Sequence, residues 1–394
     1  MFSEVFDLLP VGRLLEISQK AGDAEVGAIL RKGGAGSLEE FAALLSPAAG
    51  KQLETLAALS QQTTRRHFGK VVRLFAPLYL SNECVNICKY CGFSRNNEIP
   101  RITVPPAKVE AEAKILAGQG FRSLLLVAGE HPRHVSEGYL KECLEGCIRH
   151  VPSLLLEIAP METEDYLPLA EAGCEGIVVY QETYHGPTYK DLHPHGPKKH
   201  FHWRLDSAER AYAAGFRRLG IGALFGLANW QYEALCLAAH ALHLNRHCCN
   251  SQLSISFPRM RPASGEFEPS KENLLPDREL VQLVCALRLL LPHAAFVLTT
   301  REPEGFRDGL IPLGITNISA GSSTEPGGYS DYDPESWKQK REQKGEQFQI
   351  ADERSPAEMA ELLRKKDLEP VWKDFDSSLV TAFPTNLPAA GSCP

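Results

Sequence analysis

Short apolar runs alternate with longer segments of helical periodicity along the middle of the chain. The apolar runs span residues 72–80, 122–127, 153–159, 175–181, 217–225, 252–257, 295–300 and 315–320. Between them, apolar residues recur at the spacing of an amphipathic helix, and several of these segments end in Gly. Strands that alternate with helices predict a parallel sheet with crossover connections.

Eight strand–helix units over about 250 residues fit the α/β class as a closed (β/α)8 TIM-type barrel, whose active site lies at the C-terminal ends of the strands. We therefore assign residues 72–325 to the barrel. Residues 1–71 have the pattern of amphipathic helices and form a predicted N-terminal helical extension. Residues 326–394 are rich in Pro, Gly and charge with little periodicity, which predicts an irregular C-terminal extension that packs on the barrel.

Composition narrows the classes of function. The 394 residues are 43% hydrophobic, enough for a large core, and their formal net charge of −7 argues against a nucleic-acid partner, which usually requires a basic face. The N-terminal stretch lacks the basic and apolar regions of a signal peptide, and no run approaches the ~20 apolar residues of a membrane span. We expect a cytoplasmic protein, without a membrane partner, that acts on a small molecule.

Three cysteines directly after the first apolar run suggest a metal site. Cys84, Cys88 and Cys91 follow the pattern C-x3-C-x2-C, and no second cysteine pair completes the four ligands of a structural zinc site. An iron–sulfur cluster can be held by three thiolates with one iron left open, and Gly92 would let the backbone come close. The other cysteines in helical segments are expected to be small core residues.

This cysteine pattern, with the aromatic Tyr90 before the last cysteine, resembles the radical S-adenosylmethionine superfamily. The resemblance implies a 4Fe-4S cluster whose open iron binds the methionine moiety of S-adenosylmethionine. One electron then cleaves the cofactor into methionine and a 5′-deoxyadenosyl radical. A zinc-binding barrel that acts as a scaffold is the alternative of a different class.

Further blocks narrow the resemblance. Six separated blocks occur in the order that is typical of the 2-iminoacetate synthase family, the tyrosine lyases of thiamine thiazole biosynthesis. The blocks are LLSPAAGKQLETLA, LLLVAGEH, VYQETYH, SFPRMRP, TTREPEGFRDGLIPL and STEPGGY. The resemblance implies cleavage of the Cα–Cβ bond of L-tyrosine to 2-iminoacetate and p-cresol. It also implies flavodoxin or ferredoxin as the electron donor and thiazole synthase as a possible partner.

Two related chemistries remain as alternatives. The tyrosine-cleaving enzyme of hydrogenase maturation shares the barrel but carries a second cluster in a C-terminal extension. The tail of this chain has a single cysteine, Cys393, which cannot hold a cluster by itself. A radical lyase that acts on another aromatic amino acid is the second alternative.

Charged residues at the predicted strand ends are the candidates for binding the cofactor. The resemblance implies that Glu130 contacts the methionine ammonium group and that Glu182 and Arg204 bind the ribose hydroxyls and the methionine carboxylate. Arg offers a bidentate fork for a carboxylate. A structural ion pair is the competing interpretation for Glu182 and Arg204.

Tyrosine is a zwitterion, so its site needs a cation for the carboxylate. Arg301 fits that need. The predicted substrate-binding set also contains Thr299, Arg259, Ser322 and Thr324, and Arg261 could assist or brace the rim of the barrel. His185 is the candidate for moving the phenol proton.

Two positions depart from the family pattern. Glu325 stands where Gln is usual before PGGY, and Thr299 stands where Ser is usual. Both keep a hydrogen-bonding group, but Glu325 adds a charge that would affect substrate binding if it faced the substrate. Two groups of histidines, His193, His195, His200 and His202 in one loop and His240, His243 and His247 at helical spacing, have no complementary acidic or cysteine set at metal-ligand spacing. We expect them on a solvated loop and a solvated helix face.

Overall fold

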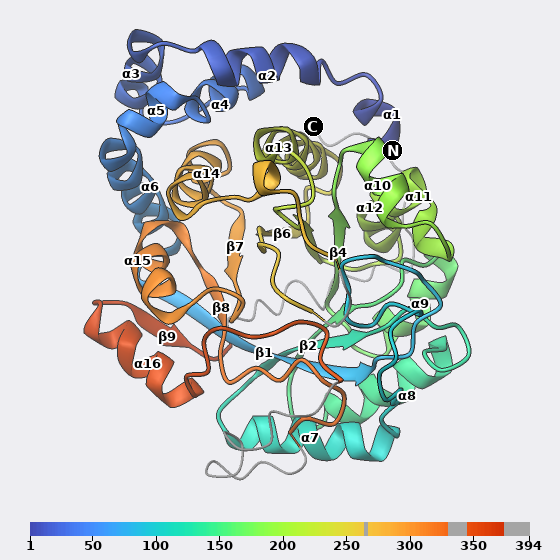
Figure 1. The fold of residues 1–394 in the computed structure, drawn as a ribbon. Helices are drawn as coiled ribbons and strands as arrows, with labels where there is room; N and C mark the ends of the chain where they lie inside the picture. Colours follow the sequence, from blue (N-terminus) through green and yellow to red (C-terminus); the bar gives the residue numbers. More distant parts are fainter. Residues whose placement is uncertain (264–266, 330–344, 374–394) are drawn as a thin grey trace.

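The computed structural model describes residues 1–263, 267–329 and 345–373, and its centre is a closed barrel of parallel strands (Figure 1). Each strand pairs with the next in sequence, and β1 closes the ring by pairing with both β2 and β8. The barrel strands are β1 Val71–Ser81, β2 Ser123–Ala128, β3 Ser153–Glu157, β4 Gly176–Glu182, β5 Arg218–Ala223, β6 Gln252–Ser256, β7 Ala295–Leu298 and β8 Asn317–Ser319. The predicted (β/α)8 barrel is confirmed.

Helices lie outside the strands, as the alternating pattern predicted (Figure 1). Gly173 and Gly215 follow the helices α9 (Thr163–Glu171) and α12 (Ser207–Ala213) with φ of 95° and 106°, a left-handed conformation that ends a helix readily only at Gly. The elements between the strands are α7 Pro106–Gly118, α8 Glu137–Cys147, α9 Thr163–Glu171, α10 Gly186–Leu192, η1 Pro197–Lys199, α11 Phe201–Leu205, α12 Ser207–Ala213, α13 Trp230–His247, η2 Lys271–Asn273, α14 Asp277–Leu290 and α15 Glu304–Gly314.

The strands divide their residues between two environments with a period of two. In β3, Leu154 and Leu156 are fully buried against the helices, whereas Ser153, Leu155 and Glu157 line a cavity inside the barrel. Because successive side chains of a strand point to opposite faces, Ser153 and Glu157 are directed inward while Leu154 and Leu156 face the helices. The barrel interior is therefore more polar than the layer between strands and helices.

The N-terminal helices pack along one side of the barrel, over α13, α14 and α15 (Figure 1). They are α1 Phe2–Phe6, α2 Val11–Lys20, α3 Asp23–Lys32, α4 Leu38–Leu44, α5 Pro47–Lys51 and α6 Leu53–Phe68. Phe2 stacks on His240 at a centroid distance of 4.2 Å, and Tyr184 bonds the Nδ1 atom of the same ring. His240 is thus a buried residue packed against α1, and not the solvated helix-face residue that its spacing suggested.

The described part of the C-terminal extension is more regular than its sequence suggests. It contains α16 Pro356–Lys365 and β9 Glu369–Val371, and β9 pairs in parallel with residues 71–73 of β1. Ser355 and Glu358 form a capping box that starts α16, a local signal that the composition of the whole segment conceals. In the described part of the chain, no helix has the length and apolar character needed to cross a membrane.

Candidate active site

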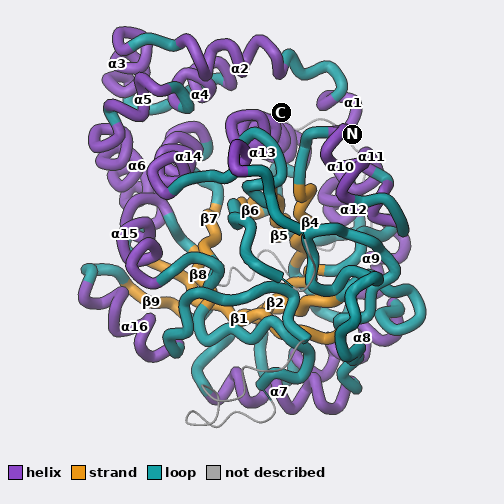
Figure 2. The backbone as a smooth tube through the Cα atoms, viewed as in Figure 1, coloured by secondary structure: helices purple, strands orange, loops and turns teal. Residues whose placement is uncertain are grey.

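The loop after β1 carries the three predicted metal ligands, over one end of the strand ring where long loops gather (Figure 2). Burial raises the pKa of the Cys91 thiol to about 11, so its thiolate form depends on a bound cation. Three thiol side chains in one loop form a donor set that suits a 4Fe-4S cluster, in which each thiolate would bind one iron and one iron would stay open.

Two contacts hold the cysteine loop in shape. Arg101 donates four hydrogen bonds of 2.6–3.0 Å to the carbonyl oxygens of Asn82, Phe93, Ser94 and Asn97. Gly92 has no room for a Cβ atom, which would clash with the carbonyl oxygens of Glu346 and Gln347. The close approach expected at this glycine is thus made to the C-terminal extension.

The predicted cofactor-binding residues lie together in one network of ion pairs at the barrel mouth. Arg204 Nη1 donates to Glu130 Oε1 at 2.9 Å, and its Nε donates to the carbonyl oxygen of Tyr180. Glu182 Oε1 accepts from Lys198 Nζ at 2.7 Å and lies 3.9 Å from Arg204 Nη2. We call Glu130, Glu182, Lys198 and Arg204 the mouth network. Its side chains are at most 12% exposed, so these pairs are poorly screened by solvent.

The mouth network keeps its carboxylates charged. Burial alone would raise the pKa of Glu130, but the nearby charges of Arg204 and Lys198 hold it below its ordinary value. Burial would also raise the pKa of Glu182, but the charges of Lys198 and Arg204 outweigh burial, so that the pKa is lowered. Glu182 has a positive φ of 69°, at an irregularity in the pairing of β4 with β5. Backbone strain of this kind persists where the surrounding structure fixes a side chain at a functional site.

Sequence reasoning missed two members of this region. Lys198 lies in the loop HGPKKH, whose histidines drew attention but whose lysines gave no distinguishing signal. Asn86 lies within the cysteine motif, and its Nδ2 donates to Glu130 Oε2 at 2.6 Å while its Oδ1 accepts from the backbone of Lys198. Asn86 thus joins the cysteine loop to the mouth network.

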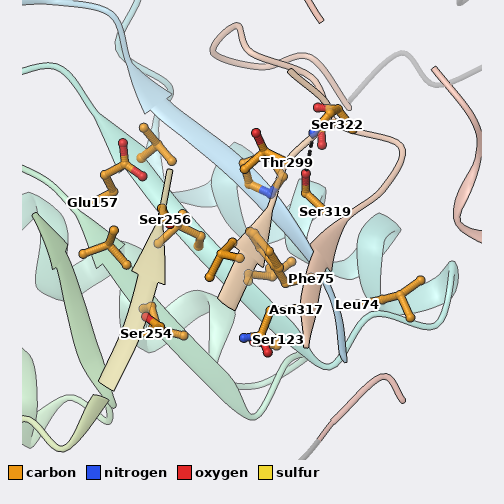
Figure 3. Close-up of a pocket in the computed structure, with 18 of the residues that line it drawn as sticks. Leu74, Phe75, Ser123, Glu157, Ser254, Ser256, Thr299, Asn317, Ser319 and Ser322 are labelled. Carbon is orange, nitrogen blue, oxygen red and sulfur yellow. Dashed lines mark hydrogen bonds between the residues drawn. The ribbon is translucent and has the colours of Figure 1, made fainter. Parts of the chain in front are cut away.

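A cavity runs inside the barrel below the cysteine loop, and several predicted substrate-binding residues line it (Figure 3). Thr299, Arg301, Ser322 and Thr324 are all among its lining residues. The Ser322 hydroxyl is buried and has no hydrogen-bond partner among the described residues. Because this hydroxyl can both donate and accept a hydrogen bond, it is available to bind a ligand in the cavity.

The Arg301 guanidinium lies in this cavity without a carboxylate partner among the described residues. It lies 3.3 Å from the centroid of the Phe348 ring, a cation–π contact. Burial lowers the pKa of Arg301, although the nearby Tyr79, Tyr180 and Glu182 oppose that shift. Phe348 belongs to the extension that was expected to be irregular, so nothing in the sequence predicted this contact.

Glu157 is a cavity residue that sequence reasoning missed. It is the last residue of β3, and its carboxylate faces the cavity (Figure 3). No hydrogen bond or ion pair to its side chain occurs within the described ranges. Burial and the charge of Glu182 raise the pKa of Glu157 to about 7, against the opposing charge of Arg301. We call Glu157 and Arg301 the cavity pair; they do not form an ion pair with each other.

Three other predicted residues lie outside the cavity lining. Arg259 makes ion pairs with Glu302 and Asp277, so it braces the rim of the barrel, and Arg261 also reaches Glu302. His185 is the N-cap residue of α10, and its ring bonds Thr188 Oγ1 at 2.8 Å rather than lining the cavity.

Glu325, the charged departure from the family pattern, also lies outside the cavity lining. Burial and the charge of Glu346 raise its pKa. The extra charge is thus placed beside another carboxylate of the C-terminal extension and not beside Arg301.

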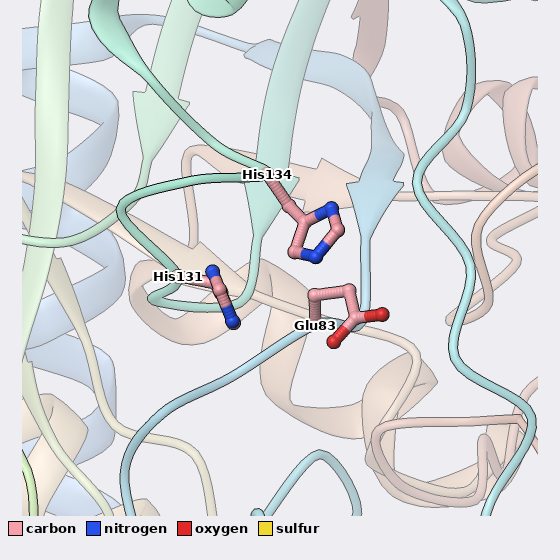
Figure 4. Close-up of side chains that lie close together, drawn as sticks. All are labelled: Glu83, His131 and His134. Atoms are coloured by element: carbon pink, nitrogen blue, oxygen red, sulfur yellow. The ribbon is translucent and has the colours of Figure 1, made fainter.

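Glu83, His131 and His134 lie close together, with side-chain ligand atoms within 4.8 Å of one another (Figure 4). Glu83 and His131 also line a pocket beside the cysteine loop, together with Cys84 and three arginines, Arg95, Arg101 and Arg133. We call the residues that line this pocket the basic hollow. Because like charges repel at short range, the three arginines oppose a cation there and favour a negatively charged partner.

Comparisons with known proteins place the chain in a family. Residues 78–236 match the model of the Radical SAM superfamily, and residues 256–369 match the Biotin and Thiamin Synthesis associated domain. The chain is 44% identical to the 2-iminoacetate synthase of Escherichia coli (strain K12) over 86% of this chain and 88% of the relative. It is 43% identical to that of Salmonella typhimurium (strain LT2) over 89% and 90%.

A solved structure shows the same fold. The crystal structure of HydG, a maturase of the FeFe-hydrogenase, matches with a TM-score of 0.83 and 31% identity over 92% of this chain and 79% of that chain. A radical S-adenosylmethionine domain implies a 4Fe-4S cluster, S-adenosylmethionine, a small-molecule substrate and a reductant, which agrees with the cysteine loop and the polar cavity. The chain therefore belongs to the 2-iminoacetate synthase family of radical S-adenosylmethionine enzymes.

Proposed function

We propose that this enzyme cleaves the Cα–Cβ bond of L-tyrosine to give 2-iminoacetate and p-cresol, for thiamine thiazole biosynthesis. The observation that carries the proposal is the cavity that holds an unpaired Arg301 close enough to Glu182 of the mouth network for their charges to interact. A cation inside the barrel, next to the residues that would bind the cofactor, suits the carboxylate of an amino acid. The family and the match to a domain associated with thiamin synthesis support the same reaction.

The residues that would hold the cofactors are the three thiols and the mouth network. Cys84, Cys88 and Cys91 would each bind one iron of the 4Fe-4S cluster, and Glu130, Glu182 and Arg204 would bind S-adenosylmethionine. When bound, these groups supply one electron and a 5′-deoxyadenosyl radical that abstracts hydrogen from the substrate. Asn86 joins the cysteine loop to the mouth network, and Arg101 holds the loop itself, through the hydrogen bonds described above.

The cavity residues would orient the substrate. Arg301 would bind its carboxylate in a charge-assisted pair, with Thr299 and Ser322 as hydrogen-bonding groups on the same wall. Phe348 stacks on the guanidinium and limits its movement. A misplacement of about 1 Å can cost two orders of magnitude in rate, so this fixed cation is the residue on which cleavage depends. His185 remains the proposed group for the phenol proton, although it would have to act at a distance from the cavity lining.

The test is anaerobic incubation of the reduced enzyme with tyrosine and S-adenosylmethionine, followed by chromatography. We expect 5′-deoxyadenosine, p-cresol and glyoxylate, the hydrolysis product of 2-iminoacetate. Formation of 5′-deoxyadenosine without p-cresol would show that the cavity takes another molecule. Carbon monoxide or cyanide would favour the hydrogenase-maturation chemistry, and a colourless protein without broad absorption near ~400 nm would favour the zinc scaffold.

The reductant and the recipient of the product are also proposed. Flavodoxin or ferredoxin, both acidic electron carriers in the general case, would dock on the basic hollow, which includes Cys84 and three arginines. Arg133→Glu should raise the KM for the carrier at low salt and leave turnover with a small chemical reductant unchanged. Unchanged KM would reject this docking site. Thiazole synthase would receive 2-iminoacetate, which hydrolyses in water.

A further inference from the structure

The cavity pair is unusual because its two opposite charges face the same space without bonding each other. Glu157 ends β3 and Arg301 follows β7, strands on opposite sides of the ring. Each lines the cavity, and neither side chain has an ion pair within the described parts of the chain. In the mouth network, by contrast, Glu130 and Glu182 each bond a cation at less than 3 Å.

A buried charge without a partner is costly unless a ligand completes it. An α-amino acid carries one positive and one negative group on the same carbon, and it can satisfy an acceptor and a donor that stand apart. We propose that Glu157 accepts a hydrogen bond from the α-ammonium group of the substrate while Arg301 holds its α-carboxylate, so that the cavity recognises an amino acid as a zwitterion. This inference rests on the proposed function for the place of the substrate, and it assigns a role to Glu157 that the reaction alone does not.

The surroundings of Glu157 explain why the carboxyl would respond to a ligand. It is faced by Tyr79 of β1, by Tyr180 and Glu182 of β4, by Lys198 and Arg204 after β4, and by Arg301. Burial and Glu182 favour its neutral form, and the three cations oppose them without making contact. An ammonium group arriving at hydrogen-bond distance would shift the balance to the carboxylate.

The alternative partner for Glu157 is the phenol hydroxyl of tyrosine. The position next to Glu182 favours the ammonium group, because the reacting end of the substrate must lie near the residues that would bind S-adenosylmethionine. The two readings predict different behaviour with analogues that lack one group each, and they can be separated by binding alone.

The experiment measures binding to the reconstituted holoenzyme, with S-adenosylmethionine present and without reductant. The ligands are L-tyrosine, 3-(4-hydroxyphenyl)propionate, which lacks the amino group, and L-phenylalanine, which lacks the hydroxyl. Wild type should bind tyrosine roughly 10- to 100-fold more tightly than the analogue without the amino group, the range expected for a hydrogen bond between charged groups. Glu157→Gln should lose most of this preference and keep the preference of tyrosine over phenylalanine.

Glu233→Gln is the matched control. Glu233 is also a buried carboxyl whose pKa is raised to about 7 by burial, but its oxygens accept from Thr183 and from the backbone of Tyr184 and it does not line the cavity. This variant should keep the full preference for the amino group. Its absorption spectrum and that of Glu157→Gln should match wild type, which shows that the cluster is intact.

Three results would overturn the inference: an unchanged amino-group preference in Glu157→Gln, an equal loss of affinity for all three ligands, or a lost preference for the hydroxyl in place of the amino group. Failure of the inference and failure of the proposed reaction give different results. If wild type forms p-cresol but Glu157→Gln behaves as wild type in binding, the reaction stands and the inference fails. If wild type forms no p-cresol but binds α-amino acids with a preference that depends on Glu157, the inference stands and the reaction fails.

Discussion

The mouth network and the cavity pair are two groups of buried charges in one barrel, and they are neutralised in different ways. The four side chains of the mouth network bond one another, with Arg204 on Glu130 and Lys198 on Glu182. In the cavity pair, Arg301 has only the ring of Phe348, and Glu157 has no bonded partner in the described ranges. The first group is complete in the protein alone, whereas the second needs a ligand.

This difference separates charges that stabilise the fold from charges that cost stability. Removing one member of a bonded buried pair leaves an uncompensated charge and destabilises the protein strongly. Removing a charge that had no partner relieves a desolvation cost. Substitutions in the mouth network should therefore lower stability, whereas substitutions in the cavity pair should keep or raise it, even where both reduce activity. This is the behaviour expected if a binding site is kept at the expense of stability.

Loss of the metal should have the largest effect and should leave both regions folded. Cys88→Ala removes one of three thiolates, so we expect bound iron and p-cresol formation to be lost together. Iron analysis and chromatography check this. Cys143→Ala is the control, because Cys143 is buried in the core on α8 and should leave the iron content unchanged. Full iron content in Cys88→Ala would contradict the ligand assignment.

Lys198→Met tests the bonded region. It leaves the buried Glu182 carboxylate without its nearest cation, so the free energy of unfolding should fall by about 3–5 kcal/mol. The measurement is the unfolding temperature of Lys198→Met compared with that of Lys199→Met. Lys199 is a matched control because it is the neighbouring lysine and is exposed. Equal unfolding temperatures for the two variants would show that the Lys198–Glu182 pair contributes nothing to stability.

Arg301→Ala tests the cavity. The fold should keep its stability, because the guanidinium has no ion pair to lose, but p-cresol formation should fall by about two orders of magnitude for want of an oriented substrate. Slow, abortive cleavage of S-adenosylmethionine should continue and can be followed as 5′-deoxyadenosine. A proportional loss of both products would mean that Arg301 serves the cofactor.

The smallest effect is the pH dependence of stability from Glu157. Because its folded-state pKa, about 7, lies above the ordinary value for Glu, its contribution is fully present below about pH 4.5 and is lost as the pH rises to about 7. The stability that Glu157→Gln gains over wild type should therefore be larger at pH 8 than at pH 5.5, by about 2 kcal/mol. Denaturant unfolding at the two pH values checks this. A variant less stable than wild type at pH 8 would place Glu157 in a bonded network.

The sequence predicted the barrel because each unit carries its own signal. All eight apolar runs overlap a strand, and many of the polar residues within them, such as Ser123, Ser254 and Asn317, line the cavity. Glu157 was missed for a related reason: the run 153–159 extended past it, so it was counted inside a strand and not at its end. A strand of five residues ends at Glu157, where the general rule for barrels places functional groups.

The remaining misses involve contacts between segments that are distant in sequence. Phe348 reaches Arg301 from the C-terminal extension, and Lys198 reaches Glu182 from a loop with no regular pattern. Arg259 follows a strand as predicted, but the nearby carboxylates of Glu302 and Asp277 hold its side chain at the rim. Which neighbour captures a long charged side chain depends on the folded surroundings, which periodicity does not encode.

The pairing of β9 with the first three residues of β1 has a consequence for how the protein is synthesised and folds. Residues 71–73 receive their β9 partners only from residues 369–371, nearly 300 positions later, and their partner β8 also comes late in the chain. On a ribosome, which adds about 5–20 residues each second, the strand that leads into the cysteine loop has to wait for almost the whole chain to emerge. Insertion of iron and sulfide is therefore expected to be a late step of biogenesis, after translation of the barrel is complete.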